Sequence, residues 1–501
     1  MRFIPALRIP LRGCWARPGF RFGIGVDQNV TPACRTSKIG GTGSFLLVYR
    51  RVVVHWRAII LLLILALATV PIAYGDFFDL ITLALFLLFI ASQVFWIGRI
   101  LDLGERFVPG KPRRASLAIV AGLVYLFVLA YSFPGIESSL HVFRAVEYPL
   151  RRVVTEAAFW WWFVGSQVAF LLVIAFGMAD RAARAIAWVY GKARKAMQGH
   201  GAALQPDAIA FDPSSTARRR FLEQTAVLVS ATPFVVAGYG LLYGRLDVEV
   251  VRRRISLARL PKVFEGFRIA QLSDIHLGPF TSADYIRHCV AITNGLNPDL
   301  VVLTGDYICW DPRAEGEAVR ALAALHAPHG IFGCLGNHEE EGKIEESITP
   351  LFAAQGIRIL RQESVAIRLS GETLNLIGMD EPRGEEWERD VYRRLQQVKG
   401  LVMPRTVNIL LLHYPAVFDY VTELGVPIDL TLAGHTHGGQ LSLDFVHRGL
   451  NLGRLVTHYV SGWYEKGGHQ LYVNRGIGTT GFPIRLGARP EITVFELTRP
   501  V

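Results

Sequence analysis

Cysteine is scarce in this chain of 501 residues, and acidic residues are scarce in its first half. The five cysteines form no CxxC pair and are odd in number, so the sequence indicates neither a disulfide framework nor a structural zinc site. Before residue 251 basic residues outnumber acidic ones roughly two to one, whereas the rest of the chain is close to neutral. A near-neutral C-terminal half argues against a nucleic-acid partner, because phosphate backbones bind basic surfaces.

Hydrophobic residues are abundant, at 51% of the chain, which is high for a purely soluble protein. Four apolar runs each approach the roughly 20 residues that a helix needs to cross a bilayer. A fifth run, 221–243, follows three arginines and contains Glu223, so we interpret it as a fifth membrane helix or an export signal. The four earlier runs are residues 58–74, 78–97, 115–133 and 157–178.

These runs divide the chain into a membrane half and a soluble half. Basic residues lie before the first run, in the loop between the second and third runs, and directly before the fifth run. This distribution predicts a cytoplasmic N-terminus. Five spans would then place the C-terminal half outside, on the periplasmic side of a bacterial-type inner membrane. The predicted segments are a basic, disordered leader over 1–44, four membrane helices within 45–198, a linker over 199–220, the span 221–243 and a domain over 244–501.

From Phe267 onward, short apolar strands alternate with amphipathic helices. This alternation predicts an α/β domain, a layered β-sandwich flanked by helices, with its chemistry on the loops after the strands. The strands are expected within 267–276, 298–306, 330–338, 406–415 and 428–437. The helices are expected within 282–296, 315–326, 345–356 and 416–425.

Polar side chains follow all five expected strands, and most are flanked by glycine. Side chains at the carboxyl ends of such strands can meet at one edge. A mixture of imidazole and carboxylate suits Mn, Fe or Zn, and a carboxylate can bridge two such ions. The residues are Asp274 and His276, then Asp306, then Asn337 and His338, then His413, and last His435 and His437. Any one of them alone could be structural, but their conjunction predicts a two-metal site.

The order D-x-H, G-D, G-N-H-E, H and G-H-x-H resembles the calcineurin-like metallophosphoesterase superfamily, and the resemblance covers about 264–497. It implies that the first metal is held by Asp274, His276 and His437, and the second by Asn337, His413 and His435. It further implies that Asp306 bridges the metals, with a metal-bridging hydroxide as nucleophile. His338 would protonate the leaving-group oxygen or stabilise the charge that develops on it.

The whole layout looks like the membrane-anchored branch of that superfamily, the transmembrane proteins with a metallophosphoesterase domain. The resemblance implies hydrolysis of a phosphate ester or pyrophosphate bond in a phosphorylated small molecule or a lipid-linked phosphate. Alternatives are a UDP-2,3-diacylglucosamine-type pyrophosphate hydrolase of lipid A synthesis, a transporter or sensor with an accessory phosphoesterase domain, and a nuclease. Arg475 and Arg485 could approach a phosphate, but a solvated or structural role is favoured for both. The substrate-binding residues and the oligomeric state are not identified.

Overall fold

The computed structural model describes residues 84, 87–96, 98, 150–197 and 216–500, apart from 385, 445, 446 and 448. The predicted leader, the runs 58–74 and 115–133, and residues 199–215 of the predicted linker lie outside the described residues, as does much of the run 78–97. The four-span membrane region therefore stays a prediction.

Two described helices are long and apolar enough to cross a membrane. They are α5, Leu150–Met197, and α6, Thr216–Tyr239, which continues as the π-helix η1, Gly240–Gly244. At 48 residues, α5 is about 70 Å long, more than twice the hydrocarbon thickness of about 30 Å. The apolar stretches are Glu156–Ala193 and Val227–Gly244, and a shorter apolar helix covers Leu87–Trp96. The runs predicted at 157–178 and 221–243 therefore do form helices.

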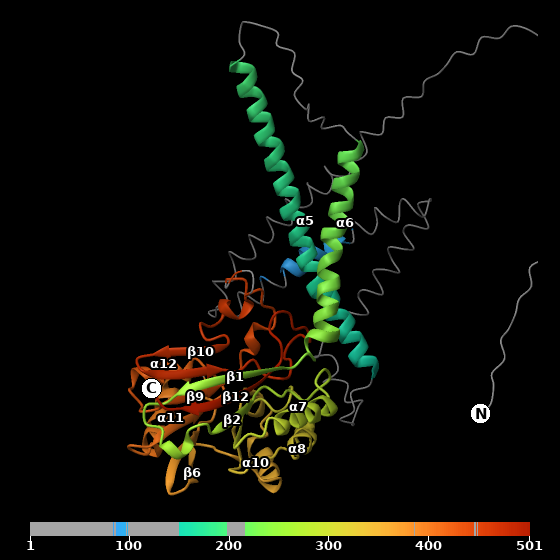
Figure 1. Cartoon of the computed structure of the whole chain (residues 1–501). Helices are drawn as coiled ribbons and strands as arrows, with labels where there is room; N and C mark the ends of the chain where they lie inside the picture. The colour runs from blue at the N-terminus through green and yellow to red at the C-terminus, as the bar shows by residue number, and fades with distance from the viewer. Residues whose placement is uncertain are drawn as a thin grey trace, which may run out of the picture. The chain divides into compact units, whose positions relative to one another are not determined.

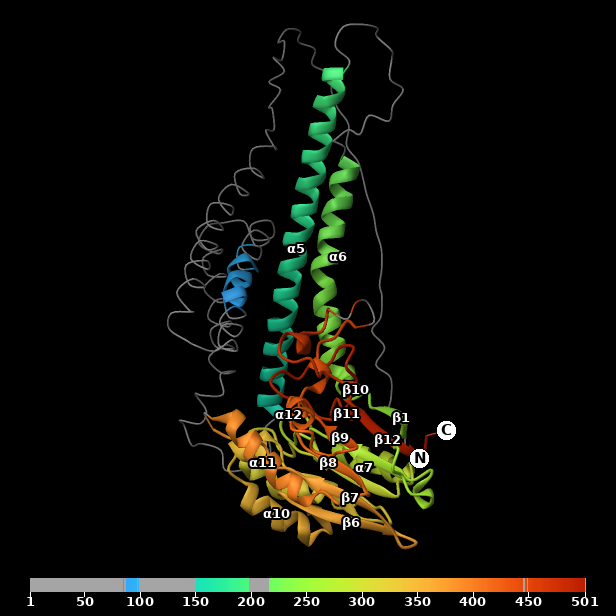
Figure 2. The same cartoon turned by 90° about the vertical axis from the view of Figure 1, so that its left-hand side faces the viewer.

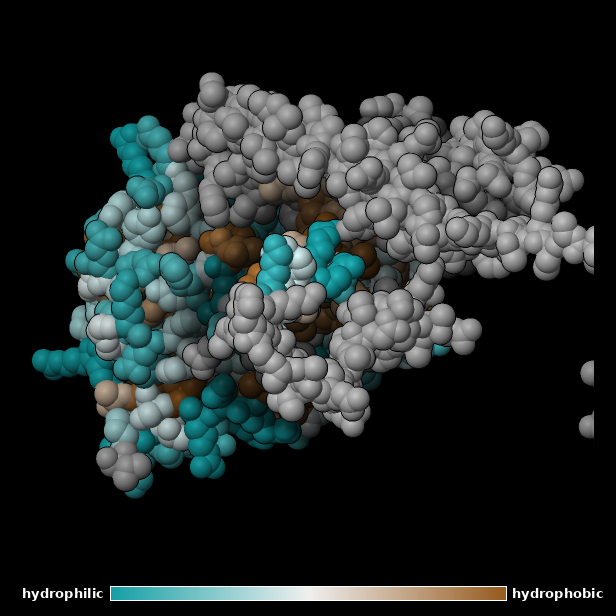
Figure 3. Space-filling model, turned by 90° about the horizontal axis from the view of Figure 1, so that it is seen from above, coloured by the Kyte–Doolittle hydropathy of each residue, from teal (hydrophilic) through white to brown (hydrophobic). Residues whose placement is uncertain are grey.

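Helices α5 and α6 pack closely through a small residue on α5. The Trp161 indole N–H donates to the carbonyl of Phe234 at 2.7 Å, and a side chain at Gly165 would overlap the Phe234 ring. Figure 2 shows the two helices side by side. Several large apolar side chains on their outer faces are exposed, among them Leu171, Trp188 and Val235. Hydrophobic surface also gathers in patches beside hydrophilic surface in the view from above (Figure 3). Exposed apolar helix faces are expected where lipid is the solvent.

The C-terminal domain is built on two six-stranded mixed sheets. One sheet has the strand order β1-β12-β2-β3-β4-β5, and the other has the order β10-β11-β9-β8-β7-β6. The order of the second sheet can be followed in Figure 2. In the first sheet β2 to β5 run parallel, and in the second β7, β8, β9 and β11 do. The strands are β1 Glu249–Ser256, β2 Arg268–Leu272, β3 Leu300–Thr304, β4 Ile331–Cys334, β5 Ile357–Ile359, β6 Glu363–Leu369, β7 Glu372–Gly378, β8 Val407–Leu411, β9 Leu430–Ala433, β10 Gly462–Lys466, β11 His469–Val473 and β12 Glu491–Thr498.

Helices cover the outer face of each sheet, so the layers run helix, sheet, sheet, helix (Figure 1). One apolar core lies between the sheets, and two more lie beneath the helices. The predicted layered α/β architecture is confirmed. The helices are α7 Ala283–Gly295, α8 Glu315–Leu322, α9 Asn337–Glu341, α10 Glu345–Ala354, α11 Trp387–Leu401 and α12 Val417–Glu423. The 3-10 turns are η2 Lys262–Phe264, η3 Pro312–Ala314, η4 His437–Gly439 and η5 Leu452–Leu455.

The π-helix η1 packs directly on a C-terminal segment of the domain. The backbone N–H of Arg485 donates to the carbonyl of Gly240 at 3.3 Å, and Ile484 is buried beside Leu241. A Cβ at Gly244 would overlap the carbonyl oxygen of Arg485. Glycine at this position therefore allows the helix end and the segment to touch.

We expect Gly244→Ala to lower the Tm of the full chain. The new Cβ would force the backbone at Arg485 to move, which should cost about 1–3 kcal/mol of stability. Gly238→Ala is the matched control, since its new Cβ would meet nothing closer than 3.5 Å. Thermal unfolding of both variants in the same detergent measures the difference. Equal Tm values would show that the contact between η1 and the segment is loose.

Candidate metal centre

The eight residues predicted from the sequence come together at one place. Three loops after β2, β3 and β4 come from one sheet, and two loops after β8 and β9 come from the other. Because the carboxyl ends of the parallel strands in both sheets meet there, residues separated by up to 163 positions become neighbours. Six of the eight are buried, and Asn337 and His435 are half-buried.

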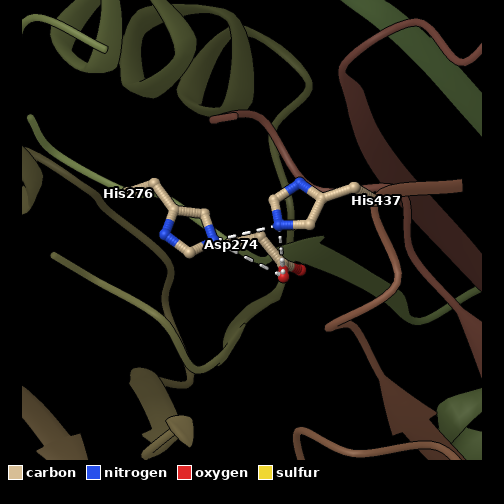
Figure 4. A group of neighbouring side chains, drawn as sticks. All are labelled: Asp274, His276 and His437. Atoms are coloured by element: carbon tan, nitrogen blue, oxygen red, sulfur yellow. Dashed lines mark hydrogen bonds and ion pairs between the residues drawn. The ribbon is translucent and has the colours of Figure 1, made fainter. Parts of the chain in front are cut away.

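The first group is Asp274, His276 and His437 (Figure 4). The Nε2 atoms of the two histidines lie 3.0 Å apart. Oδ1 of Asp274 lies 3.3 Å from Nε2 of His437 and 4.0 Å from Nε2 of His276. Figure 4 shows all three side chains pointing toward one another. Three potential ligand atoms thus surround one small volume.

The second group is Asp306, His413 and His435, with Asn337 beside it. Oδ2 of Asp306 lies 3.1 Å from Nε2 of His413. Nδ1 of His435 lies 3.2 Å from that same Nε2 and 3.0 Å from Oδ1 of Asn337. Oδ2 of Asp306 is also 3.4 Å from Nε2 of His276 in the first group. Asp306 therefore stands between the two groups, where a bridging carboxylate would stand.

His338 faces Asp306 from the start of α9. Its Nε2 lies 3.8 Å from Oδ2 of Asp306, and its Nδ1 accepts a hydrogen bond from the backbone N–H of Trp310 at 3.4 Å. The Trp310 ring lies against the imidazole, with centroids 4.1 Å apart. Burial lowers the pKa of His338. The ring is therefore held neutral with its proton on Nε2, the nitrogen that points into the site.

Five of these residues have left-handed backbone conformations, which cost energy for side chains other than glycine. Their φ angles are 49° for Asp274, 46° for His276, 58° for Asp306, 74° for His435 and 51° for His437. Such strain persists only where the surrounding structure holds it, and it clusters at functional sites.

Glycines in the motifs leave room for the carboxylates. A Cβ at Gly434 would overlap Oδ2 of Asp274, and a Cβ at Gly336 would overlap Oδ1 of Asp306. The G-H and G-N-H motifs therefore need glycine for close approach of the backbone to the site.

The donor atoms fit a pair of divalent cations. Nδ1 of His413 lies 2.7 Å from the carbonyl of Thr304 and must donate to it, so Nε2 turns a lone pair toward Asp306 and His435. A proton or a cation placed among these atoms would relieve the repulsion between the Nε2 lone pair of His413 and the carboxylate of Asp306. Burial alone would lower the pKa of His413, but the charge of Asp306 raises it well above its usual value. Burial also raises the pKa of Asp274 to about 6. Both shifts follow from packing these ionisable groups together away from water.

Burial lowers the pKa values of His276, His435 and His437, so these rings are neutral at physiological pH. A neutral imidazole is the form that binds a metal ion.

Glu339 supports the site, and our interpretation of the sequence missed it. This fully buried carboxylate accepts four backbone hydrogen bonds, from Asp306 and Gly336 on Oε2 and from Tyr307 and Ile308 on Oε1. Burial and the charge of Asp306 raise its pKa to about 8. However, the four N–H groups leave no acceptor for a carboxyl proton, so we assign the ionised form. The only signal for Glu339 in the sequence was its place as the last residue of the motif G-N-H-E.

We expect Glu339→Gln to destabilise the domain by about 3 kcal/mol, because the new amide NH₂ would face two N–H donors in a buried place. The Tm should fall by about 5–10 °C. Glu341→Gln makes the same chemical change two residues later at an exposed position and should leave the Tm unchanged. An unchanged Tm for Glu339→Gln would mean that the bonds to Glu339 do not hold the loop after β3.

The two arginines that could have approached a phosphate are structural. Arg485 is buried, donates to the carbonyls of Gly478, Ala488 and Arg475, and lies 3.0 Å from Nδ1 of His437. Arg475 forms ion pairs with Glu249 and Glu491. Arg485 therefore supports the loop that carries His437, and the sequence alone did not predict this role.

Comparisons with known proteins agree with this geometry. The profile of the family described as calcineurin-like phosphoesterase matches residues 267–439. The chain is 32% identical over 294 residues to the uncharacterized metallophosphoesterase YkuE of Bacillus subtilis, covering 56% of this chain and 97% of that protein. It is 29% identical over 286 residues to the phosphodiesterase YaeI of Escherichia coli, covering 56% and 98%. It is also 29% identical over 282 residues to a Danio rerio protein named transmembrane protein with metallophosphoesterase domain, covering 54% and 61%.

Proposed function

The chain belongs to the calcineurin-like metallophosphoesterase family and is a hydrolase of phosphoric ester bonds, and from this premise we propose that it works with two divalent metal ions. The observation that carries the proposal is the convergence of two carboxylates and five imidazoles at one edge of two sheets. Mixed nitrogen and oxygen ligands favour Mn, Fe or Zn.

The ligand assignment follows the two groups of side chains. Asp274, His276 and His437 would hold one ion, and Asn337, His413 and His435 would hold the other, with Asp306 shared. When bound, the two cations supply Lewis acidity toward the phosphoryl oxygens and a water molecule of lowered pKa.

His338 would act on the leaving group. Its Nε2 carries the proton and points into the site, since the Trp310 backbone N–H occupies Nδ1. A hydrogen bond from Nε2 to the leaving oxygen stabilises the charge that develops there as the P–O bond breaks.

We further propose that the enzyme is anchored in a membrane and acts on a lipid-linked or other phosphate ester at its surface. Two apolar helices indicate membrane association, and only residues 245–248 separate η1 from β1. The external, periplasmic placement and the bacterial-type inner membrane rest on the charge pattern of the sequence alone. No contact within the described residues favours the nuclease or the transporter and sensor hypotheses, and we do not propose them.

Chelation of the purified full chain in detergent should abolish hydrolysis of p-nitrophenyl phosphate and bis-p-nitrophenyl phosphate. Restoring Mn, Fe or Zn should recover it, because the paired carboxylates and imidazoles have no catalytic water without the ions. Release of p-nitrophenol and elemental analysis of the protein are measured together. Full activity in protein that elemental analysis shows to be metal-free would refute the proposal.

A further inference from the structure

A cleft of about 790 Å³ opens beside the second group of the candidate metal centre. Asn337 and His435 are among the residues that line it, and the Tyr414 ring lies against His435 with centroids 4.6 Å apart. A phosphate placed at the centre would therefore extend its ester group into this cleft. We call it the acidic-aromatic cleft, after the residues that line it.

Four aromatic rings form one part of its wall. Tyr414 and Trp387 meet edge to face at 5.6 Å and 90°, Trp387 and Tyr420 at 5.8 Å and 72°, and Tyr420 and Tyr392 at 5.4 Å and 90°. Trp387 and Tyr392 come from α11, Tyr420 from α12 and Tyr414 from the loop after β8. Rings set at right angles present faces in several directions, and aromatic faces attract cations.

The other lining groups are mostly carboxylates, and the described residues that line the cleft include no lysine or arginine. Tyr420 and Tyr392 donate hydrogen bonds to Glu388 and Glu423, each at 3.1 Å. Among the lining carboxylates and their described neighbours, only Asp419 forms an ion pair with a basic side chain, that of Lys466. The carboxylates are Glu341, Glu381, Glu388, Asp419 and Glu423.

Glu381 lines the cleft close to the candidate metal centre and is only 9% exposed. Within the described part of the chain it forms no hydrogen bond and no ion pair. Burial raises the pKa of Glu381 to about 8, so a positively charged ligand group beside it would stabilise the ionised form.

Taking the proposed phosphoesterase function as given, we propose that the acidic-aromatic cleft binds a cationic ammonium group on the alcohol of a phosphodiester substrate. Carboxylates attract the charge, and the faces of Trp387 and the tyrosines pack against the alkyl groups that carry it. A polyanion would be repelled. The cleft therefore disfavours nucleic acids and also the second phosphate of a UDP-linked substrate such as UDP-2,3-diacylglucosamine.

The test compares p-nitrophenyl phosphorylcholine with p-nitrophenyl 3,3-dimethylbutyl phosphate, which has carbon in place of the quaternary nitrogen. In both, water adds to phosphorus and p-nitrophenol leaves, so only the charge differs. With the metal-loaded full chain in detergent, we expect kcat/KM to be about tenfold higher for the choline ester, and the ratio to fall with added salt.

Variants identify the cleft as the source of the preference. Trp387→Leu and Glu388→Gln should each move the ratio of the two kcat/KM values toward one. Glu372→Gln, at an exposed position at the opposite, amino end of β7, should leave the ratio unchanged. Hydrolysis of phosphatidylcholine vesicles faster than glycerophosphocholine would assign the ammonium group to a lipid headgroup, and the reverse would assign it to a soluble diester.

Turnover of both p-nitrophenyl esters with a ratio near one would overturn the inference and leave the phosphoesterase function standing. Faster hydrolysis of p-nitrophenyl glycerol phosphate than of either ester would show that the cleft binds a neutral polyol and not a cation. No turnover of any ester with any metal would refute the phosphoesterase function and this inference together.

Discussion

Asp306→Asn is expected to lower metal-dependent hydrolysis by at least about 10³-fold while the protein stays folded. A neutral amide cannot bridge two cations, and the loss of several kcal/mol of charge stabilisation gives a factor of this size. Asparagine tolerates the left-handed conformation that residue 306 adopts, φ 58°. It also keeps the oxygen that accepts the backbone N–H of His338 at 3.0 Å. The measurement is kcat/KM on bis-p-nitrophenyl phosphate with saturating metal.

The control is Asp284→Asn, the same chemical change at an exposed position of α7. It should retain full activity. Circular dichroism and Tm of both variants separate loss of chemistry from loss of fold. Near-normal turnover by Asp306→Asn with its metals retained would contradict the assignment of Asp306 as the shared ligand.

His338→Ala is expected to lower turnover of a substrate with a poor leaving group by about 10²–10⁴-fold, the usual contribution of a positioned proton donor. An alkoxide or phenolate leaving from phosphorus needs stabilisation by the Nε2 proton. p-Nitrophenolate leaves readily without it, so the loss on bis-p-nitrophenyl phosphate should be much smaller. The measurement is kcat for phenyl and p-nitrophenyl esters of the same phosphate.

His288→Ala, at an exposed position of α7, is the matched control and should leave both rates unchanged. The dependence on the leaving group separates a proton donor from a metal ligand, because loss of a ligand would slow both esters equally. If kcat fell equally for the two esters, His338 would not be the proton donor.

Much of the candidate site was predictable because its residues follow a simple local rule. Each of the five motifs stands directly after a short apolar strand, and glycine accompanies most of them, as in the stretch from Gly434 to His437. The strands β2, β3, β4, β8 and β9 all form where the apolar runs predicted them. Local sequence determines these features because burial selects the strands and glycine permits the tight turns after them.

Other parts of the fold gave weaker local signals. The alternation of strands and helices did not predict β1, because its sequence EVVRRRIS carries three arginines in succession. In the structure β1 pairs along its whole length with β12, at the far end of the chain. It also left out the helices α9 and α11 and the strands β5, β6, β7, β10, β11 and β12. Pairing between distant segments stabilises such strands, and this information is absent from any short window of sequence.

The roles of Glu339 and Arg485 also depended on the tertiary structure. Glu339 is one of three consecutive glutamates, and only its burial against the loop after β3 distinguishes it from Glu340 and Glu341. Arg485 could have been a phosphate ligand, but backbone carbonyls surround its guanidinium. A side chain's partners are set by which loops pass nearby, and sequence does not specify this.

The sequence by itself determined the class of chemistry, since two carboxylates, an amide and five imidazoles in this order suit metal-dependent phosphoryl transfer and little else. Only the tertiary structure decided that two opposed sheets contribute to one site, that five of its residues have strained backbones, and that an acidic and aromatic cleft adjoins it. The reason is physical: ligand types are properties of single residues, whereas distances, strain and clefts arise from packing between segments far apart in the chain.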